Sequence, residues 1–368
     1  MARSKWISFV GQQALDRAAA AADSRPKVPP SPTVSSADAK KFGLENFGNT
    51  CYANSVLQAL YFCTPFRDLP AVTLPYAPIP PIPSSPPTLF SALRSLFLYI
   101  SSHPKERGTV SPRAFIDKVK ELNELFRGTM HQDTHEFLMF LLNRIVEEIE
   151  EERKELLNGG AKEEDRTSPQ DATLVHKLFE GVLTSETRCL TCETVSSRDE
   201  SFLDLSIDIE QNSSVTACLR QFSASEMLCQ KNKFFCDACC DLQEAEKRMK
   251  IKKLPNVLAL HLKRFKYQED VGRYIKLAYR VAFPMDLRLF NTVDDMDDSD
   301  RLYNLFAVVV HIGNGPHHGH YISIIKTHGS WLVFDDDNVS TIPESDIPKY
   351  FGDSNSGSAY VLYYQAAD

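Results

Sequence analysis

The sequence has no apolar run long enough to span a membrane and no signal-peptide pattern. It lacks the basic excess of a typical nucleic-acid binder, because its formal net charge is −8. Disulfide scaffolds are short and rich in paired cysteines, whereas this chain has 368 residues and nine cysteines, an odd number. With 43% hydrophobic residues it can bury a large core. These features predict a soluble protein of a reducing compartment, cytoplasmic or nuclear, with no membrane or nucleic-acid partner.

Cys51 stands at a predicted helix start. In the run GLENFGNTCYANSVLQAL (residues 43–60), polar Asn49 and Thr50 precede a stretch with helical apolar periodicity. Unpaired backbone N–H groups and the positive end of the helix dipole at such a position favour a thiolate over a thiol. A thiolate is a nucleophile, which favours covalent catalysis, although a lone cysteine is more often simply packed in a core. The choice depends on a partner elsewhere in the chain.

A histidine and an acid lie on a predicted β-hairpin near the end of the chain. Residues 321–325 and 331–334 have strand patterns, and residues 326–330 form the turn between them. Antiparallel pairing brings His320 beside Asp335, so the carboxylate can fix the imidazole tautomer while the other ring nitrogen faces a thiol. The order Cys, His, Asp is typical of cysteine hydrolases. Spacing alone leaves His317 and His318 open as alternatives to His320, and Asp336 and Asp337 as alternatives to Asp335.

Two CxxC pairs predict a metal site. Four thiolates from two such pairs have the spacing of a tetrahedral zinc site, and four-sulfur zinc sites are typically structural. Redox-active or merely buried thiols are the alternative, and Cys240, directly after the second pair, leaves the register open. We therefore predict one structural zinc ion. Its ligands are Cys189, Cys192, Cys236 and Cys239.

The pattern along the chain changes from helical to strand-like, which predicts an α+β layout. Residues 1–41 are Ala-, Ser- and Pro-rich and are predicted to form a disordered arm, with a short helix near residues 7–22. Residues 70–87 contain eight prolines and are predicted to form a surface insertion. Helices are expected at 51–63, 89–102, 112–126 and 132–151, and strands at 181–188, 201–209, 247–254, 257–264, 281–283, 305–311, 321–325, 331–334 and 360–364.

Together these motifs resemble the ubiquitin-specific protease family. Besides the run around Cys51, HQDTHEFLMFLL (131–142), LALHLKRFKY (258–267) and GHYISII…WLVFDDD carry the similarity, in family order from about Phe42 to Tyr364. Within the family, the chain is most similar to the small WD40-activated deubiquitinases of animals and their fungal CreB-type relatives. The resemblance implies a papain-like fold in a catalytic domain at 42–366, with a thumb (about 42–175), zinc-bearing fingers (about 180–255) and a palm (about 256–366).

The resemblance also implies roles that spacing alone leaves open. Asn46, which could simply form an Asx-type turn, becomes a donor to the oxyanion of the reaction. Asp133 and Glu136, which could merely complement a helix dipole, become contacts for the ubiquitin tail together with Gln132. The zinc would hold fingers that grip the body of ubiquitin.

The implied reaction is thiol-dependent hydrolysis of the isopeptide bond between the C-terminal glycine of ubiquitin and a lysine. His320 would take the proton of Cys51, and no metal would take part in the reaction. The resemblance further implies ubiquitin and ubiquitinated proteins as partners, and a WD40-repeat protein as activator. A catalytically weak ubiquitin-binding scaffold and a Cys–His–Asp acyltransferase are the alternative functions.

Overall fold

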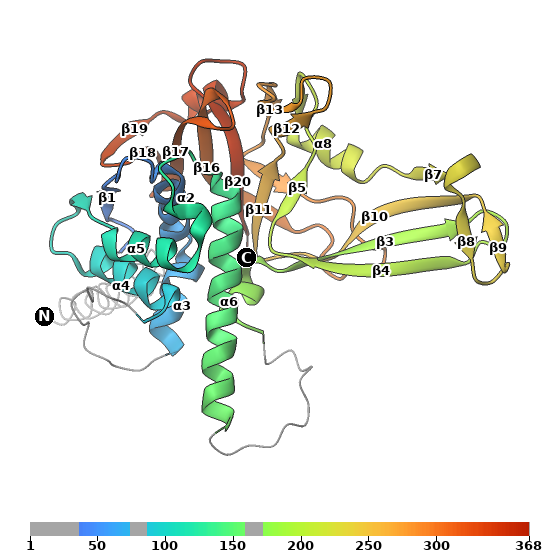
Figure 1. Ribbon diagram of the computed structural model, residues 1–368, viewed down its shortest axis with the longest axis horizontal. Coiled ribbons are helices and arrows are strands. Elements are labelled where there is room, and N and C mark those ends of the chain that lie inside the picture. Colours follow the sequence, from blue (N-terminus) through green and yellow to red (C-terminus); the bar gives the residue numbers. More distant parts are fainter. Residues whose placement is uncertain (1–36, 74–86, 159–171, 368) are drawn as a thin grey trace, which may run out of the picture. The chain divides into compact units, whose positions relative to one another are not determined.

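The computed structural model describes residues 37–73, 87–158 and 172–367 (Figure 1). The short helix expected near residues 7–22, most of the expected proline-rich insertion and the residues that follow helix α6 (Thr134–Asn158) lie outside these ranges. Among the described residues, no helix is both long and apolar enough to cross a membrane.

Two expected boundaries are wrong. The arm was expected to extend to residue 41, but Ala37 and Lys40 are buried. The Lys40 ammonium donates to the backbone carbonyls of His103 and Lys105 (2.6 and 3.2 Å), which offsets the cost of burying its charge. The proline-rich insertion was expected from residue 70, but Pro70 lies within helix α3 (Thr64–Thr73), near its end, where the missing N–H removes one backbone hydrogen bond.

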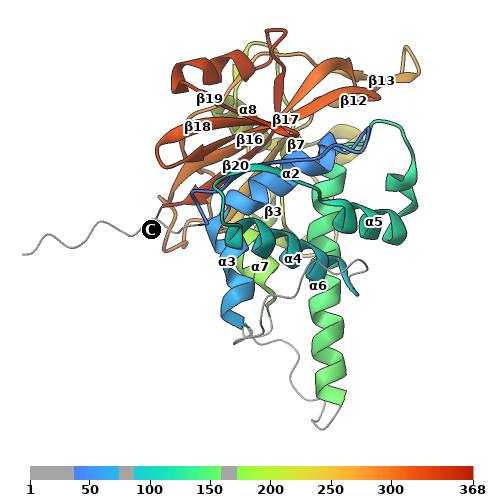
Figure 2. The same cartoon turned by 90° about the vertical axis from the view of Figure 1, so that its left-hand side faces the viewer.

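The helices pack around α2 (Cys51–Phe62), which is buried along its whole length. One hydrophobic core joins α2 to the helices around it and to one face of the main sheet (Figure 2). Helix α4 (Leu89–Ser102) has the bounds that periodicity predicts, because Thr88 and Ser91 form a capping box at its start. The other helices are α5 (Arg113–Leu122), η1 (Glu124–Arg127), α6 (Thr134–Asn158), α7 (Leu174–Phe179), α8 (Val215–Phe222), η3 (Gln230–Asn232) and η4 (Glu344–Tyr350).

The main sheet has the strand order β19-β18-β17-β16-β20-β11-β5, with β15 paired to β16. All its pairs are antiparallel except β11–β5. Alternate residues of β11 face opposite sides, so Val257 and Ala259 join the core with the helices, while Leu258 and Leu260 join a second core on the other face. The strands are β5 (Leu205–Ile207), β11 (Val257–Leu262), β15 (Asp286–Arg288), β16 (Leu302–Gly315), β17 (His318–Thr327), β18 (Ser330–Asp335), β19 (Asn338–Ile342) and β20 (Ser358–Ala366).

A second sheet, ordered β4-β3-β10-β7, runs away from the main sheet, and the β8–β9 hairpin lies at its far end (Figure 1). The single strand expected over 201–209 is wrong: its first residues end β4, and its later ones form β5 in the main sheet. The chain passes from one sheet to the other at Leu203–Asp204, so one continuous strand is impossible. The bounds are β3 (Gly181–Cys189), β4 (Val195–Phe202), β7 (Glu226–Leu228), β8 (Phe234–Cys236), β9 (Asp241–Gln243) and β10 (Ala245–Lys253).

Three short pairs complete the layout. They are β1 (Lys41–Leu44) with β2 (Arg107–Val110), β6 (Ser213–Ser214) with β14 (Val281–Ala282), and β12 (Phe265–Gln268) with β13 (Arg273–Lys276). Helices followed by mostly antiparallel sheets confirm the α+β prediction.

Arg264 is fully buried between β11 and β12. Its guanidinium donates to four backbone carbonyls and has no carboxylate partner among the described residues; burial lowers its pKa to about 10. The carbonyls come from the chain after β13, from the end of η4 and from β20, so one side chain ties these three segments together. They belong to Leu277 (3.1 Å), Tyr279 (2.8 Å), Phe351 (3.1 Å) and Ala359 (2.6 Å).

Candidate active site

Cys51 is the first residue of α2 and is 4% exposed. N–H groups in the first turn of a helix have no partner within the helix. Among the described residues, no backbone acceptor is bonded to the N–H of Cys51, whereas the Thr50 hydroxyl accepts from Phe47 N (3.0 Å) and fixes the approach to the helix. The Cys51 thiol and an unpaired N–H donor therefore lie at the same point of the chain.

His320 and Asp335 come from the neighbouring strands β17 and β18. Their side chains meet, with His320 Nε2 2.6 Å from Asp335 Oδ1, which leaves Nδ1 of the ring for Cys51. The hydrogen bond with Cys51 is the largest cause that raises the pKa of His320, to about 9; the bond to Asp335 adds to it, and burial opposes both. The structure thus brings His320 rather than the exposed His317 or His318 to the carboxylate.

Asp336 faces two side-chain amides instead. Its Oδ2 accepts from Asn46 Nδ2 (2.8 Å) and its Oδ1 accepts from Asn54 Nδ2 (2.9 Å), while Oδ2 is 3.9 Å from His320 Nε2. Asp336 has a φ of 50°, a left-handed conformation that Asp tolerates better than most residues. The two adjacent carboxylates thus have different partners: Asp335 contacts the imidazole and Asp336 contacts the amides.

The two interpretations of Asn46 are compatible. Its Oδ1 accepts from the backbone N–H groups of Gly48 (2.8 Å) and Thr50 (3.1 Å), which is an Asx-type turn. With the oxygen held there, Nδ2 must face Asp336, and the second N–H of that nitrogen has no partner among the described residues. Asn46 therefore forms the turn and still offers a donor near Cys51.

The helix expected over 132–151 includes Gln132 and Asp133, and this boundary is wrong. Helix α6 begins at Thr134, so the first two residues precede it. Gln132 is buried and donates weakly to the carbonyl of Met130 (3.3 Å). The helix begins later than expected because Asp133 caps it from outside, so that the chain turns into the helix at residues 132–133.

Asp133 caps α6 through its Oδ1, which accepts from the N–H groups of His135 (2.8 Å) and Glu136 (3.3 Å). Its Oδ2 accepts from the hydroxyl of Tyr360 (2.7 Å). The side chain of Glu136 is largely exposed. The part of it that is removed from water raises the pKa of its carboxyl group, and the nearby Asp133 carboxylate raises it further. Of the three residues, only Glu136 presents an exposed carboxylate to a partner.

A cluster that the sequence did not predict lies beside Asp133. His135 Nε2 is 2.9 Å from Asp204 Oδ2, and the ring of His261 stacks on His135 with centroids 3.7 Å apart. Burial holds the pKa of His261 well below its ordinary value. Nearly parallel rings direct their nitrogens side by side rather than at one point, so this cluster is suited to packing and not to chelation.

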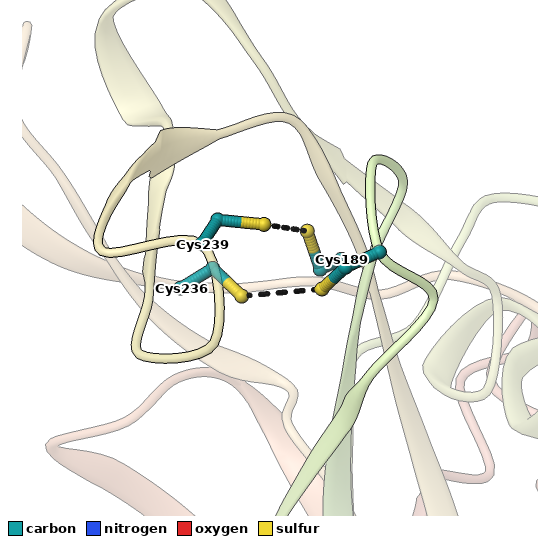
Figure 3. A group of neighbouring side chains, drawn as sticks. Cys189, Cys236 and Cys239 are labelled. Carbon is teal, nitrogen blue, oxygen red and sulfur yellow. Dashed lines mark hydrogen bonds between the residues drawn. The ribbon is translucent and has the colours of Figure 1, made fainter.

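The four cysteines of the two CxxC pairs converge at the far end of the second sheet. All four sulfurs lie within 4.8 Å of one another. The sulfurs of Cys189 and Cys239, which face each other in Figure 3, are 4.0 Å apart. Those of Cys192 and Cys236 are 3.5 Å apart. Both distances are close to the roughly 3.8 Å expected for tetrahedral zinc and far beyond the roughly 2.05 Å of a disulfide. Cys240 lies outside the cluster and donates to the carbonyl of Asp237. The donor set and its spacing fit zinc.

The family model for ubiquitin carboxyl-terminal hydrolases matches residues 42–364. The chain belongs to the ubiquitin carboxyl-terminal hydrolase family. It is 52% identical over 348 residues to ubiquitin carboxyl-terminal hydrolase 4 of Arabidopsis thaliana, covering 88% of this chain and 93% of the relative. It is also 52% identical over 340 residues to ubiquitin carboxyl-terminal hydrolase 12 of Salmo salar, covering 89% and 90%.

Solved structures with the same fold include the SAGA Ubp8/Sgf11/Sus1/Sgf73 DUB module bound to ubiquitin aldehyde. It aligns with a TM-score of 0.70 and 25% identity over 98% of this chain and 76% of the solved chain. The same module bound to monoubiquitin aligns with a TM-score of 0.69 and 27% identity, over 95% and 74%. These similarities confirm the predicted family and papain-like fold, and they make this hydrolase a cysteine-type deubiquitinase.

Two residues near the site of this hydrolase were not predicted as part of it. Asn54 and Tyr360 contact Asp336 and Asp133 respectively. A polar residue inside the apolar run of α2 was the available indication for Asn54, because a buried amide needs a partner. Nothing in the strand pattern around Tyr360 distinguishes it from the other core tyrosines of β20.

Proposed function

We propose that the chain hydrolyses the isopeptide bond between the C-terminal glycine of ubiquitin and a substrate lysine. The observation that carries this proposal is the placement of Cys51 and Asp335 on the two sides of one imidazole, with unpaired N–H groups at the start of α2. The raised pKa of His320 favours the imidazolium form of its ring.

The proposed steps follow from these positions. The Cys51 thiolate attacks the glycine carbonyl carbon, and the C=O electron pair moves to oxygen. The N–H of Cys51 and the second N–H of Asn46 stabilise this oxyanion. The C–N bond breaks as the oxyanion collapses and the His320 imidazolium gives its proton to the lysine amine, which leaves ubiquitin joined to Cys51 as a thioester. Water, deprotonated by His320, then attacks the thioester carbonyl, the C–S bond breaks, and ubiquitin leaves with a free carboxylate while Cys51 is regenerated.

We propose that one zinc ion occupies the four-cysteine cluster and takes no part in this reaction. Cys189 and Cys236 end β3 and β8, and Cys192 and Cys239 lie in the turns that lead to β4 and β9. Four thiolate ligands would therefore hold two turns together at the end of an exposed sheet. Their place supports a structural role in gripping ubiquitin.

We also propose that a WD40-repeat protein stimulates the enzyme. Sequence similarity to WD40-activated relatives motivates the idea, and the construction of the site supports it. Cys51 belongs to a helix, whereas His320 and Asp335 belong to the sheet, so their alignment depends on packing between two layers. A partner that stabilises this packing raises kcat; unchanged turnover at saturating partner would refute it.

The decisive experiment measures release of a fluorophore amide-linked to the C-terminus of ubiquitin by the wild type and by Cys51→Ala. We expect cleavage that is lost in the variant. Ubiquitin binding without cleavage by the wild type, with or without a WD40 protein, would favour the scaffold alternative. Turnover that depends on an added amine acceptor would favour the acyltransferase. Cleavage that survives in the variant would exclude Cys51 as nucleophile.

A further inference from the structure

Helix α2 carries a buried amide at Asn54, one turn after Cys51. Asn54 is 3% exposed and lies among side chains that are all buried. A buried amide is tolerated when it is hydrogen-bonded, so its partners indicate why it is there. The other buried amide of this helix, Gln58, donates to the backbone carbonyl of Phe42 (2.7 Å), away from the catalytic hairpin.

The partner of Asn54 is the carboxylate of Asp336, 282 residues later in the chain. Asn54 Nδ2 lies 2.9 Å from Asp336 Oδ1, with longer contacts to the carbonyls of Leu44 (3.4 Å) and Glu45 (3.3 Å). All three neighbours are acceptors, so the amide must present its NH₂ group to them. This bond is a charge-assisted donation from a helix residue to an anion.

The backbone around Asp336 is also held against the start of the domain. Leu44 N donates to the carbonyl of Asp336 (2.8 Å). A Cβ on Gly43 would lie 2.4 Å from the carbonyl oxygen of Asp337, so β1 can approach this turn only because residue 43 is glycine. The backbone of the turn is thus fixed, and the orientation of the carboxylate depends on its side-chain partners.

These partners form a chain from Asn54 through Asp336 to Asn46. Asp336 Oδ2 accepts from Asn46 Nδ2 at 2.8 Å, and the same oxygen lies 3.9 Å from His320 Nε2, close enough for a small rotation to bring the two together. A carboxylate released from Asn54 could rotate toward the imidazolium of His320, which attracts it more strongly than a neutral amide does. Donation from Asn54 opposes that rotation and keeps Asp336 on Asn46.

We propose that Asn54 is a positioning residue for oxyanion stabilisation, acting through Asp336 on the amide of Asn46. The inference rests on the proposed function, because the oxyanion arises only in amide or ester cleavage. Asn54 touches no reacting atom. It keeps the second N–H of Asn46 directed at the place where negative charge develops.

The test is a double-mutant cycle of Asn54→Ser and Asn46→Ala, with release of the fluorophore from ubiquitin as readout. Loss of one oxyanion donor typically lowers kcat by about 10² to 10³, so Asn46→Ala should fall in that range. Asn54→Ser should lower kcat at least about tenfold but less than Asn46→Ala, with KM changed less than about twofold. In the Asn46→Ala background, Asn54→Ser should change kcat by less than about twofold, because both changes disable one donor.

A second readout separates positioning from general damage. Ubiquitin with a C-terminal propargyl amide captures the thiol by addition across the alkyne: the C–S bond forms, the proton ends on the neighbouring carbon, and no oxyanion arises. The rate of capture by Asn54→Ser should stay within about threefold of wild type. Gln58→Leu, which also removes a buried amide from α2, is the matched control and should lower stability while kcat of the folded enzyme is kept.

Several outcomes would overturn the inference. They are additive losses in the cycle, capture that slows in parallel with kcat, or wild-type kcat in both Asn54→Ser and Asn54→Ala. All variants are assayed well below their melting temperatures, so that turnover reports folded enzyme. Failure of the wild type to cleave the ubiquitin amide would overturn the proposed function as well, whereas additivity in a cleaving enzyme would overturn only the role of Asn54.

Discussion

The ion pair between His320 and Asp335 makes a quantitative prediction about pH. The pKa of His320 is raised from an ordinary value of 6.5 to about 9, with Cys51 as the largest cause and Asp335 as a further one. Replacing Asp335 by Asn removes an anion that favours the imidazolium, so the pKa must fall. The side chains are 34% and 47% exposed, so water screens the pair, and pairs of this kind contribute about 0.2–1 kcal/mol. At about 1.4 kcal/mol per pKa unit, Asp335→Asn should lower the pKa by up to about 0.7 unit.

The assay is an NMR titration of the ring protons of the ten histidines, with His320 assigned by its disappearance in His320→Gln. Cys51→Ala should lower the pKa of His320 more than Asp335→Asn does, because the bond to Cys51 is the larger cause. Because folding raises this pKa, the pair stabilises the folded state fully below about pH 6.5, and that stabilisation is lost as the pH rises through about 9. The stability difference between wild type and Asp335→Asn should follow the same course.

Asp336→Asn is the matched control for this prediction. Its carboxylate oxygen lies 3.9 Å from His320 Nε2, against 2.6 Å for Asp335, so it should move the pKa of His320 less. It should nevertheless lower kcat, because Asp336 holds Asn46. If Asp336→Asn moved the pKa of His320 further than Asp335→Asn, the assignment of the two carboxylates would be reversed and the reasoning refuted.

Three further predictions concern other parts of the molecule. Purified wild type should contain one zinc ion per chain by elemental analysis, Cys236→Ser clearly less, and the control Cys240→Ser the same as wild type; equal zinc in all three would exclude the four-cysteine site. Arg264→Met removes a donor from four buried carbonyls, of which that of Phe351 keeps the N–H of Val281 (2.9 Å). A buried carbonyl left without a donor costs about 1–3 kcal/mol, so denaturant unfolding should show a loss of at least about 2 kcal/mol, and Arg264→Lys a smaller one; a loss below about 1 kcal/mol in Arg264→Met would contradict this role of Arg264. Glu136→Gln removes the exposed carboxylate that is expected to contact the ubiquitin tail, so it should raise KM for the ubiquitin amide several-fold, and more at low salt, at nearly constant kcat. Glu150→Gln, further along α6, should leave KM unchanged; equal effects of the two changes would point to net charge alone.

Local patterns predicted those parts of the fold whose causes are local. The periodicity and cap of α4 lie within 89–102, and the alternation of β17 and β18 with a short turn between them fixes the hairpin that carries His320 and Asp335. The start of α2 at Cys51 is likewise predicted by its neighbours, polar Asn49 and Thr50 followed by residues with helical apolar periodicity. In contrast, the strand pair β1–β2 joins two short segments more than 60 residues apart, and neither has a pattern long enough to identify a strand.

Which of Asp335 and Asp336 contacts the imidazole and which contacts the amides could not be predicted, because the choice depends on contacts between residues that lie almost the whole chain apart. Asn46 and Asp336 are 290 residues apart, and two adjacent carboxylates are equivalent in any local pattern. The two side chains differ in direction. Asp335 ends β18, and its side chain lies beside His320 of the neighbouring strand β17, whereas the side chain of Asp336, which has a positive φ, is directed toward α2 and β1.

The sequence did contain one usable indication of such a contact. Asn54 and Gln58 are spaced four residues apart in a helix whose other side chains are mostly apolar, so they lie on one face. Both donate to groups outside the helix, one to the catalytic turn and one to β1. Two buried amides on one face require fixed acceptors opposite them, so the pattern indicates that long-range contacts exist but not which residues supply them. Asn54 follows Cys51 by one turn, so its bond to Asp336 ties the part of α2 that carries the thiol to the turn after Asp335, whereas the bond of Gln58 ties the later part of the helix to the chain at β1.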